Sequence, residues 1–221
     1  MQRTAQKRPT PPTTPSVSRN RHQRAANPNL IKRRQTNPTG SPNTYPACLT
    51  VARVHPVKNH RMILEALALL AQSRPQVHWH MVGSADDLHY LQGLRATSER
   101  LGVSESVTWH GHRNDAEALM LDCDVTVLAS RSEGVPRAIQ EAMALGVPTV
   151  MPAGLAPDLE GAGLPILYRS QHPRALARAI ETAMIADPVR LAYAAQWVTQ
   201  RWSRDVVLRD WESILAHLAP S

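Results

Sequence analysis

From Ala47 onward, the chain alternates between short apolar runs rich in β-branched residues and longer segments with helical periodicity. The run ACLTVAR (47–53) has the composition of a buried strand, and NHRMILEALALLAQ (59–72) places apolar residues at helical spacing. The same reasoning predicts further strands at 77–83, 106–111, 124–130, 147–151 and 164–168. It predicts further helices at 87–102, 115–122 and 136–145, and from 172 to 218 with a break near Asp187-Pro188. Because alternating strands and helices with short connections form a parallel sheet covered on both faces, the sequence predicts a doubly wound, Rossmann-like α/β fold.

The basic residues are concentrated before this alternating region. Nine of the 25 lysines and arginines and none of the 18 acidic residues precede Ala47, so the rest of the chain holds 16 basic and 18 acidic residues. Eight of the 18 prolines lie in the same stretch, and its single aromatic residue is Tyr45. Such a composition cannot bury enough apolar surface to offset the loss of chain entropy. Residues 1–45 are therefore predicted to be a disordered, basic, Pro/Thr-rich tail, and residues 46–221 a Rossmann-like domain with C-terminal helices.

A tail of this kind can neutralise phosphates and so bind nucleic acid or an acidic lipid surface. The alternative is a leader with no selected function. The sequence contains no apolar run long enough to span a membrane and no start that resembles a signal peptide. Cys48 and Cys123 are isolated and fit no zinc-binding or C-x-x-C spacing. We therefore expect a cytoplasmic protein whose thiols are reduced and mostly buried.

In doubly wound folds, ligands bind beyond the carboxyl ends of the strands, so the loops that follow strands are the candidate sites. Arg53 and Lys58 follow the first strand across a turn that contains a proline. A planar guanidinium and a mobile ammonium together suit a diphosphate, which accepts hydrogen bonds from both. The alternative is that both are solvated surface cations.

The stretch RSEGVP (131–136) follows a buried strand and enters a helix. Gly134 allows the backbone to approach a ligand closely, and Pro136 suits the first helical position. Glu133 is then expected at the rim of a cleft, and Glu141 about one turn into the helix on its polar side. A carboxylate at the latter position can accept hydrogen bonds from a vicinal diol such as a ribose; the alternative is a solvated helix glutamate.

Other patterns add less. The loop at 151–158 contains Gly154 and could cap the same cleft. The ten histidines include no His-x-x-x-His pair and no cysteine partner, so ordinary buried or rim histidines are expected instead of a metal site. Ser130 and Ser132 are not part of a G-x-S-x-G motif, which argues against a hydrolase triad.

Three stretches together resemble a known family in order and spacing: ARVHPVKNHRMILEALALL, HMVGSADDLHYLQGL and VTWHGHRNDAEALMLDCDVTVLASRSEGVPRAIQEAMALGVPTV. They are similar to the donor-binding C-terminal half of retaining glycosyltransferases of the group 1 family, which have the two-domain GT-B architecture. The resemblance runs from about Ala47 to the C-terminus. Its most specific mark is the E-x7-E pattern of Glu133 and Glu141, with Arg53 and Lys58 upstream in the matching register.

The resemblance implies a role for each of these residues. Arg53 and Lys58 would hold the diphosphate of a nucleotide sugar, Glu133 would contact the sugar hydroxyls, and Glu141 would contact the ribose hydroxyls. Backbone N–H groups at the start of the helix would face the phosphates, near Gly134, Val135, Pro136 and Arg137. The implied reaction transfers the sugar to an acceptor hydroxyl with its anomeric configuration kept. The scheme needs no metal and no other cofactor.

The sequence also departs from the family pattern. The glycines expected beside the arginine and the lysine are Ala52 and Asn59, and the paired glycines of the last loop appear as Gly154-Leu155. The N-terminal, acceptor-binding domain of the family is absent from this sequence. We therefore expect a truncated glycosyltransferase whose acceptor is unknown, or alternatively a remnant or interaction module that keeps the fold without turnover.

The last helical segment, VVLRDWESILAHL, normally packs on that absent domain in the family. Its apolar residues include Trp211, Ile214 and Leu215. Left uncovered, such a surface is expected to bind a partner polypeptide or a second copy of the chain.

Overall fold

The computed structural model describes residues 46–218, and side chains as far as residue 215. Six parallel strands form one sheet in the order β3-β2-β1-β4-β5-β6. The strands are β1 (Ala47–Val51), β2 (His78–Val82), β3 (Val107–Gly111), β4 (Val125–Val127), β5 (Thr149–Pro152) and β6 (Ile166–Tyr168). This topology confirms the predicted doubly wound, Rossmann-like α/β fold. The predicted tail at 1–45 lies outside the described residues.

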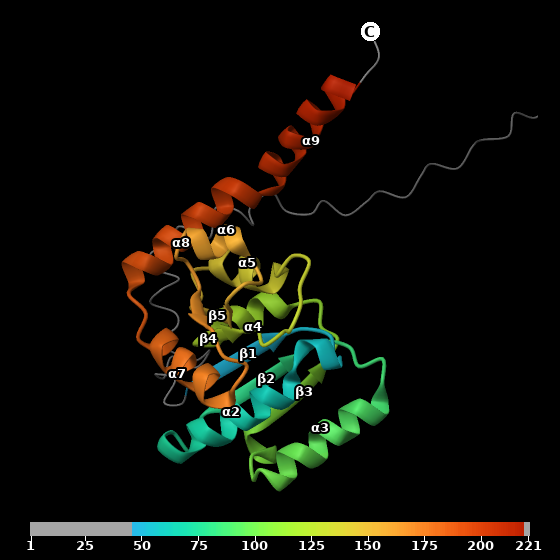
Figure 1. Cartoon of the computed structure of the whole chain (residues 1–221), viewed down its shortest axis with the longest axis vertical. Helices are drawn as coiled ribbons and strands as arrows, with labels where there is room; N and C mark the ends of the chain where they lie inside the picture. Colours follow the sequence, from blue (N-terminus) through green and yellow to red (C-terminus); the bar gives the residue numbers. More distant parts are fainter. Residues whose placement is uncertain (1–45, 219–221) are drawn as a thin grey trace, which may run out of the picture.

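Helices cover both faces of the sheet (Figure 1). On one face lie α2 (His60–Ser73), α3 (Leu88–Arg100) and α7 (Pro173–Met184), which pack on the strands through the largest cluster of buried apolar side chains. On the other face lie α4 (Ala116–Asp122) and α5 (Arg137–Ala144). Trp79 on β2 is fully buried between the sheet and the helices α2, α3 and α7. Its indole N–H donates to Thr50 Oγ1 at 3.1 Å, which satisfies the only polar atom of its ring.

Helix α2 has the pattern that the sequence predicts. Met62, Ile63, Leu67 and Leu70 are all buried against the sheet. The helix begins after Asn59, whose φ of 54° is in the left-handed region and turns the chain from the loop into the helix. A one-turn 3-10 helix, η1 (Pro56–Lys58), precedes it and was not expected from the sequence.

The C-terminal part differs from the prediction in two places. A short helix, α6 (Pro157–Gly161), occupies part of what the sequence indicated as a loop. The segment after residue 172 breaks not only before α8 (Pro188–Trp202) but also at Ser203, where extended backbone separates α8 from α9 (Arg204–Leu218). Helix α8 packs on α5 through Ala194 and Val198, whereas α9 extends away from the body of the molecule (Figure 1).

The order of strands reverses between β1 and β4, which are neighbours in the sheet although helices and two strands separate them in the chain. The loops that follow these two strands therefore lie next to each other. The backbone of Gly83, which follows β2, lies very close to the loop after β1. Gly83 has φ 150°, and a Cβ at this position would lie 2.0 Å from the carbonyl oxygen of Ala52. Beyond it, the Val54 N–H donates to Ser84 O at 2.8 Å. These contacts fix the loop that carries Arg53.

Candidate functional site

A pocket of about 340 Å³ lies at the carboxyl ends of β1 and β4, where the strand order reverses. It brings together the four side chains that the sequence singled out from two distant parts of the chain. The pocket is lined by Val51, Ala52, Arg53, Lys58, Leu128, Glu133, Val135, Pro136, Arg137, Ala138 and Glu141. Its lining thus combines three basic and two acidic side chains with apolar walls.

Lys58 and Glu133 form an ion pair at the base of the two loops. Lys58 Nζ lies 2.7 Å from Glu133 Oε1 and 2.8 Å from Oε2, and the two side chains are only 19% and 10% exposed. Ser130, which is fully buried, donates its hydroxyl to Glu133 Oε1 at 2.5 Å. The backbone adds a further link, because the Arg131 N–H donates to Val57 O at 2.8 Å. The loops after β1 and β4 are therefore joined before any ligand is bound.

Arg53 is held much less firmly. Its guanidinium lies 3.3 Å from Asp86 Oδ2, but both side chains are more than half exposed. An exposed ion pair of this kind contributes little to stability and is screened by salt. Arg53 can therefore exchange Asp86 for a more highly charged anion in the pocket at small cost.

Helix α5 supplies the other wall. It begins at Arg137, one residue later than predicted, and Pro136 occupies the N-cap position. The Arg137 N–H donates to Val135 O at 2.9 Å, which closes a tight turn before the helix. Ile139, Ala142 and Met143 are buried, so the helix presents the polar side that the sequence predicts.

Glu141 lies on that polar side. Partial burial is the main reason that the pKa of its carboxyl is raised; the nearby Arg137 lowers this pKa and Glu117 on α4 raises it further. The group is therefore easier to protonate than an ordinary surface glutamate. Cations or hydroxyl donors brought by a ligand would favour its charged form.

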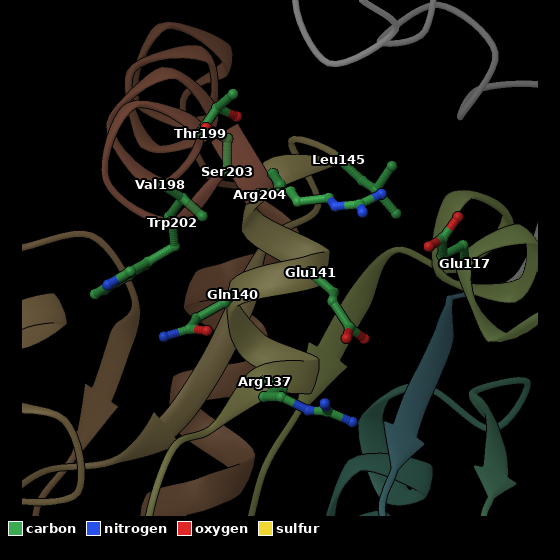
Figure 2. Close-up of a pocket in the computed structure, with 11 residues that line it drawn as sticks. Glu117, Arg137, Gln140, Glu141, Leu145, Val198, Thr199, Trp202, Ser203 and Arg204 are labelled. Atoms are coloured by element: carbon green, nitrogen blue, oxygen red, sulfur yellow. The ribbon is translucent and has the colours of Figure 1, made fainter. Parts of the chain in front are cut away.

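A second pocket, of about 430 Å³, shares Arg137 and Glu141 with the first and is shown in Figure 2. Figure 2 shows Arg137, Gln140 and Glu141 extending from α5, with α4 on one side and the junction of α8 and α9 above. This pocket is lined by Glu117, Arg137, Gln140, Glu141, Ala144, Leu145, Val198, Thr199, Trp202, Ser203 and Arg204. This pocket was not predicted from the sequence, because nearly half of its lining residues depend on how α8 and the start of α9 lie against α5.

Two glycines of the predicted site, Gly134 and Gly154, line neither pocket. Gly134 is an exposed residue of the loop between Glu133 and α5. Gly154 follows β5 with φ 89°, and its N–H donates to Glu160 Oε1 at 2.6 Å. Its predicted role as a cap over the cleft stays a prediction. Conversely, two contacts of the site were not predicted from the sequence: that of Ser130 with Glu133 and that of Asp86 with Arg53.

Three of the histidines, His78, His80 and His110, form a separate group on β2 and β3. His80 Nδ1 lies 3.0 Å from His110 Nε2, and His78 Nε2 lies 2.8 Å from Thr108 Oγ1. Burial lowers the pKa of all three imidazoles, that of His80 to about 4, so they are neutral at neutral pH. Within residues 46–218, no three or more His, Cys, Asp or Glu side chains are grouped so that they could hold a metal ion. Within the same residues, no helix has the length and hydropathy needed to cross a bilayer.

The chain is similar to known glycosyltransferases. The D-inositol 3-phosphate glycosyltransferase of Segniliparus rotundus is 26% identical over 159 residues, which cover 71% of this chain and 30% of that protein. The putative colanic acid biosynthesis glycosyltransferase WcaL of Escherichia coli is 26% identical over 195 residues, covering 82% of this chain and 47% of that protein. The crystal structure of HepE from Anabaena in complex with UDP and glucose superposes with a TM-score of 0.70 and 25% identity, covering 78% of this chain and 48% of that one.

The chain thus spans about half the length, or less, of these relatives. The family model described as "Glycosyl transferases group 1" matches residues 31–196, a range that begins within the predicted tail and covers the whole sheet. Together with the six-stranded parallel sheet, this match shows that the chain belongs to the group 1 family of glycosyltransferases.

Proposed function

We propose that this chain binds a nucleotide diphosphate sugar in the pocket between β1 and β4 and is the donor-binding domain of a retaining glycosyltransferase. The observation that carries the proposal is the convergence of Arg53, Lys58, Glu133 and Glu141 on one pocket at the reversal of strand order. Such a reversal is the usual ligand site of doubly wound sheets. The related HepE structure, which holds UDP and glucose, supports this ligand class.

In the proposed complex, Arg53 and Lys58 bind the diphosphate. The guanidinium offers two parallel N–H donors, and the ammonium offers a compact charge. During transfer of the sugar, negative charge develops on the leaving diphosphate, and both cations stabilise it. Lys58 is the last residue of η1, whereas Arg53 precedes η1, so the two cations come from different parts of the loop after β1. They can therefore contact two successive phosphates.

The two glutamates are proposed to bind hydroxyl groups, Glu133 those of the sugar and Glu141 those of the ribose. Both carboxylates line the pocket from the same side, one before α5 and one within it. Pro136 has no N–H, and the N–H of Arg137 is already donated to Val135 O. The proposed backbone contacts to phosphate therefore reduce to the N–H groups of Gly134 and Val135.

The acceptor and its binding surface are proposed to come from elsewhere, because this chain spans only about half the length, or less, of the relatives. The second candidate function is an interaction module without turnover, and the specific observation that favours it is α9. Its side chains Trp211, Ile214 and Leu215 are 58%, 50% and 60% exposed, more than folded proteins usually allow for such residues in one patch. This surface is proposed to bind a partner polypeptide or a second copy of the chain.

Nucleotide binding by the full chain tests the proposal. Uridine, guanosine and adenosine diphosphates and their sugar derivatives are titrated while the thermal unfolding midpoint is recorded. A ligand at a hundred times its dissociation constant stabilises the folded state by roughly 2.7 kcal/mol. Arg53→Ala and Lys58→Ala should each weaken binding roughly 10- to 100-fold, since each removes charge-assisted hydrogen bonds.

Arg95→Ala is the matched control, because Arg95 is an exposed arginine on α3 that lines neither pocket. It should bind like the wild type. The donor-domain proposal is wrong if no nucleotide shifts the midpoint of the wild-type chain. The assignment of the phosphate site is wrong if both cation variants bind as tightly as the Arg95 control.

A further inference from the structure

Ser130, Glu133 and Lys58 form a connected group at the base of the pocket. Both carboxylate oxygens of Glu133 lie within hydrogen-bond distance of Lys58 Nζ, at 2.7 and 2.8 Å, and the buried Ser130 hydroxyl donates to one of them. Lys58, which the proposed function assigns to the diphosphate, is therefore already paired with the Glu133 carboxylate. A ligand can reach this ammonium only by sharing it with Glu133 or by displacing Glu133.

We propose that this partly buried Ser130–Glu133–Lys58 group makes the pocket select a nucleotide diphosphate sugar over the sugar-free nucleoside diphosphate, with Ser130 as the positioning residue for the Glu133 carboxylate. The proposal rests on the proposed function and deepens it. It concerns the discrimination between the donor substrate and the product that remains after the sugar has left.

The discrimination follows from charge. A sugar ester of the terminal phosphate covers that phosphate and brings hydroxyl donors, which the Glu133 oxygens can accept. A free nucleoside diphosphate carries a further negative charge on the same terminal phosphate and brings no such donors. The Glu133 carboxylate, which pairs with Lys58, therefore accepts hydrogen bonds from the sugar hydroxyls of the first ligand and repels the additional phosphate charge of the second. Two like charges about 5 Å apart in a partly exposed site, with an effective dielectric constant of about 40, change affinity by roughly a factor of ten.

Ser130 keeps this carboxylate in place. It is fully buried, and its hydroxyl fixes Glu133 Oε1 from the side away from solvent. The link from the Arg131 N–H to Val57 O holds the loop that carries both residues against η1. Without the hydroxyl, Lys58 is the remaining side-chain partner of Glu133 within the described residues. When a terminal phosphate takes over Lys58, the Glu133 side chain can then rotate away, so that the repulsion weakens and its oxygens lose their position as hydroxyl acceptors.

The test measures two dissociation constants on the full chain by calorimetric titration, one for uridine diphosphate and one for UDP-glucose, with the guanosine and adenosine pairs as further arms. The readout is their ratio, the preference for the sugar-bearing ligand. Glu133→Gln, which keeps the shape and removes the charge, should bind the free diphosphate more tightly and lower the ratio about tenfold. Ser130→Ala should lower the ratio in the same direction, and Ser130→Thr, which restores a hydroxyl, should recover it.

Ser132→Ala is the control, since Ser132 is an exposed serine of the same loop and should keep the wild-type ratio. The selectivity proposal is overturned if wild type binds both ligands but Glu133→Gln leaves the ratio unchanged. The role of Ser130 is overturned if its alanine and threonine variants share one ratio. If no nucleotide pair binds to the wild-type chain, the proposed function itself fails, and this inference fails with it. Because Glu133→Gln is nearly isosteric, the first of these results does not depend on whether Ser130→Ala folds.

Discussion

The imidazole of His60 predicts a specific dependence of stability on pH. His60 is the first residue of α2 and is 1% exposed, packed with its ring centroid 6.3 Å from that of Trp109. Its Nδ1 atom is buried and has no hydrogen-bond partner among the described residues. Burial, and secondarily the nearby charge of Lys58, lowers its pKa to about 4. Protonation of this imidazole therefore destabilises the folded state.

The sign and size of the effect follow from linkage. The unfolded chain takes up this proton at a pKa near 6.5, well above the folded value, so the stabilising contribution is complete above pH 6.5 and is lost as the pH falls toward 4. Between pH 8 and pH 5, the difference between the two pKa values lowers the free energy of unfolding by about 2 kcal/mol. For a domain of ordinary stability this is a large fraction of the total.

The assay compares the wild type with His60→Leu by urea unfolding at pH 8 and pH 5, followed through the fluorescence of the five tryptophans. Other titrating groups contribute equally to both proteins, so the difference between the two pH dependences isolates His60. The wild type should lose about 2 kcal/mol more than His60→Leu. His89→Leu, which removes an exposed imidazole on α3, should behave like the wild type. Equal losses in the wild type and His60→Leu would refute the reasoning, whatever the stability of the variant at pH 8.

Two more predictions concern the fold. Gly83→Ala should lower the free energy of unfolding in urea by more than about 4 kcal/mol, since the new Cβ would meet the Ala52 carbonyl oxygen at 2.0 Å. Gly93→Ala, in open space within α3, is the control and should raise the free energy of unfolding by about 0.5–1 kcal/mol. Similar effects of both substitutions would contradict the close approach. Replacing both Trp211 and Leu215 by serine should change the free energy of unfolding by less than about 0.5 kcal/mol, because both side chains are exposed. The same double variant should abolish any concentration-dependent association in sedimentation. A large loss of stability would show that the α9 surface is covered within the chain.

The sequence was sufficient to predict the order and type of the main elements, because the apolar periodicity of segments such as 59–72 reflects the same burial that the structure shows. It was also sufficient to bring Arg53 and Glu133 to one edge, since the carboxyl ends of parallel strands lie together. It could not give the contact between Lys58 and Glu133, which depends on the path of two loops 75 residues apart. The break at Ser203 was also missed, because no proline or glycine marks it and apolar periodicity continues on both sides.

The two cations and the two acids of the pocket enter the structure from opposite sides of the strand reversal. Arg53 and Lys58 follow β1, within the half of the sheet made by the first three strands, whereas Glu133 and Glu141 follow β4, the first strand of the other half. In a chain that had formed only the first half, Arg53 would still have Asp86 as a partner, whereas Lys58 would lack its carboxylate, because Glu133 follows β4. The pairing of β4 with β1 brings Glu133 to this ammonium, so completion of the sheet and neutralisation of the Lys58 charge are coupled.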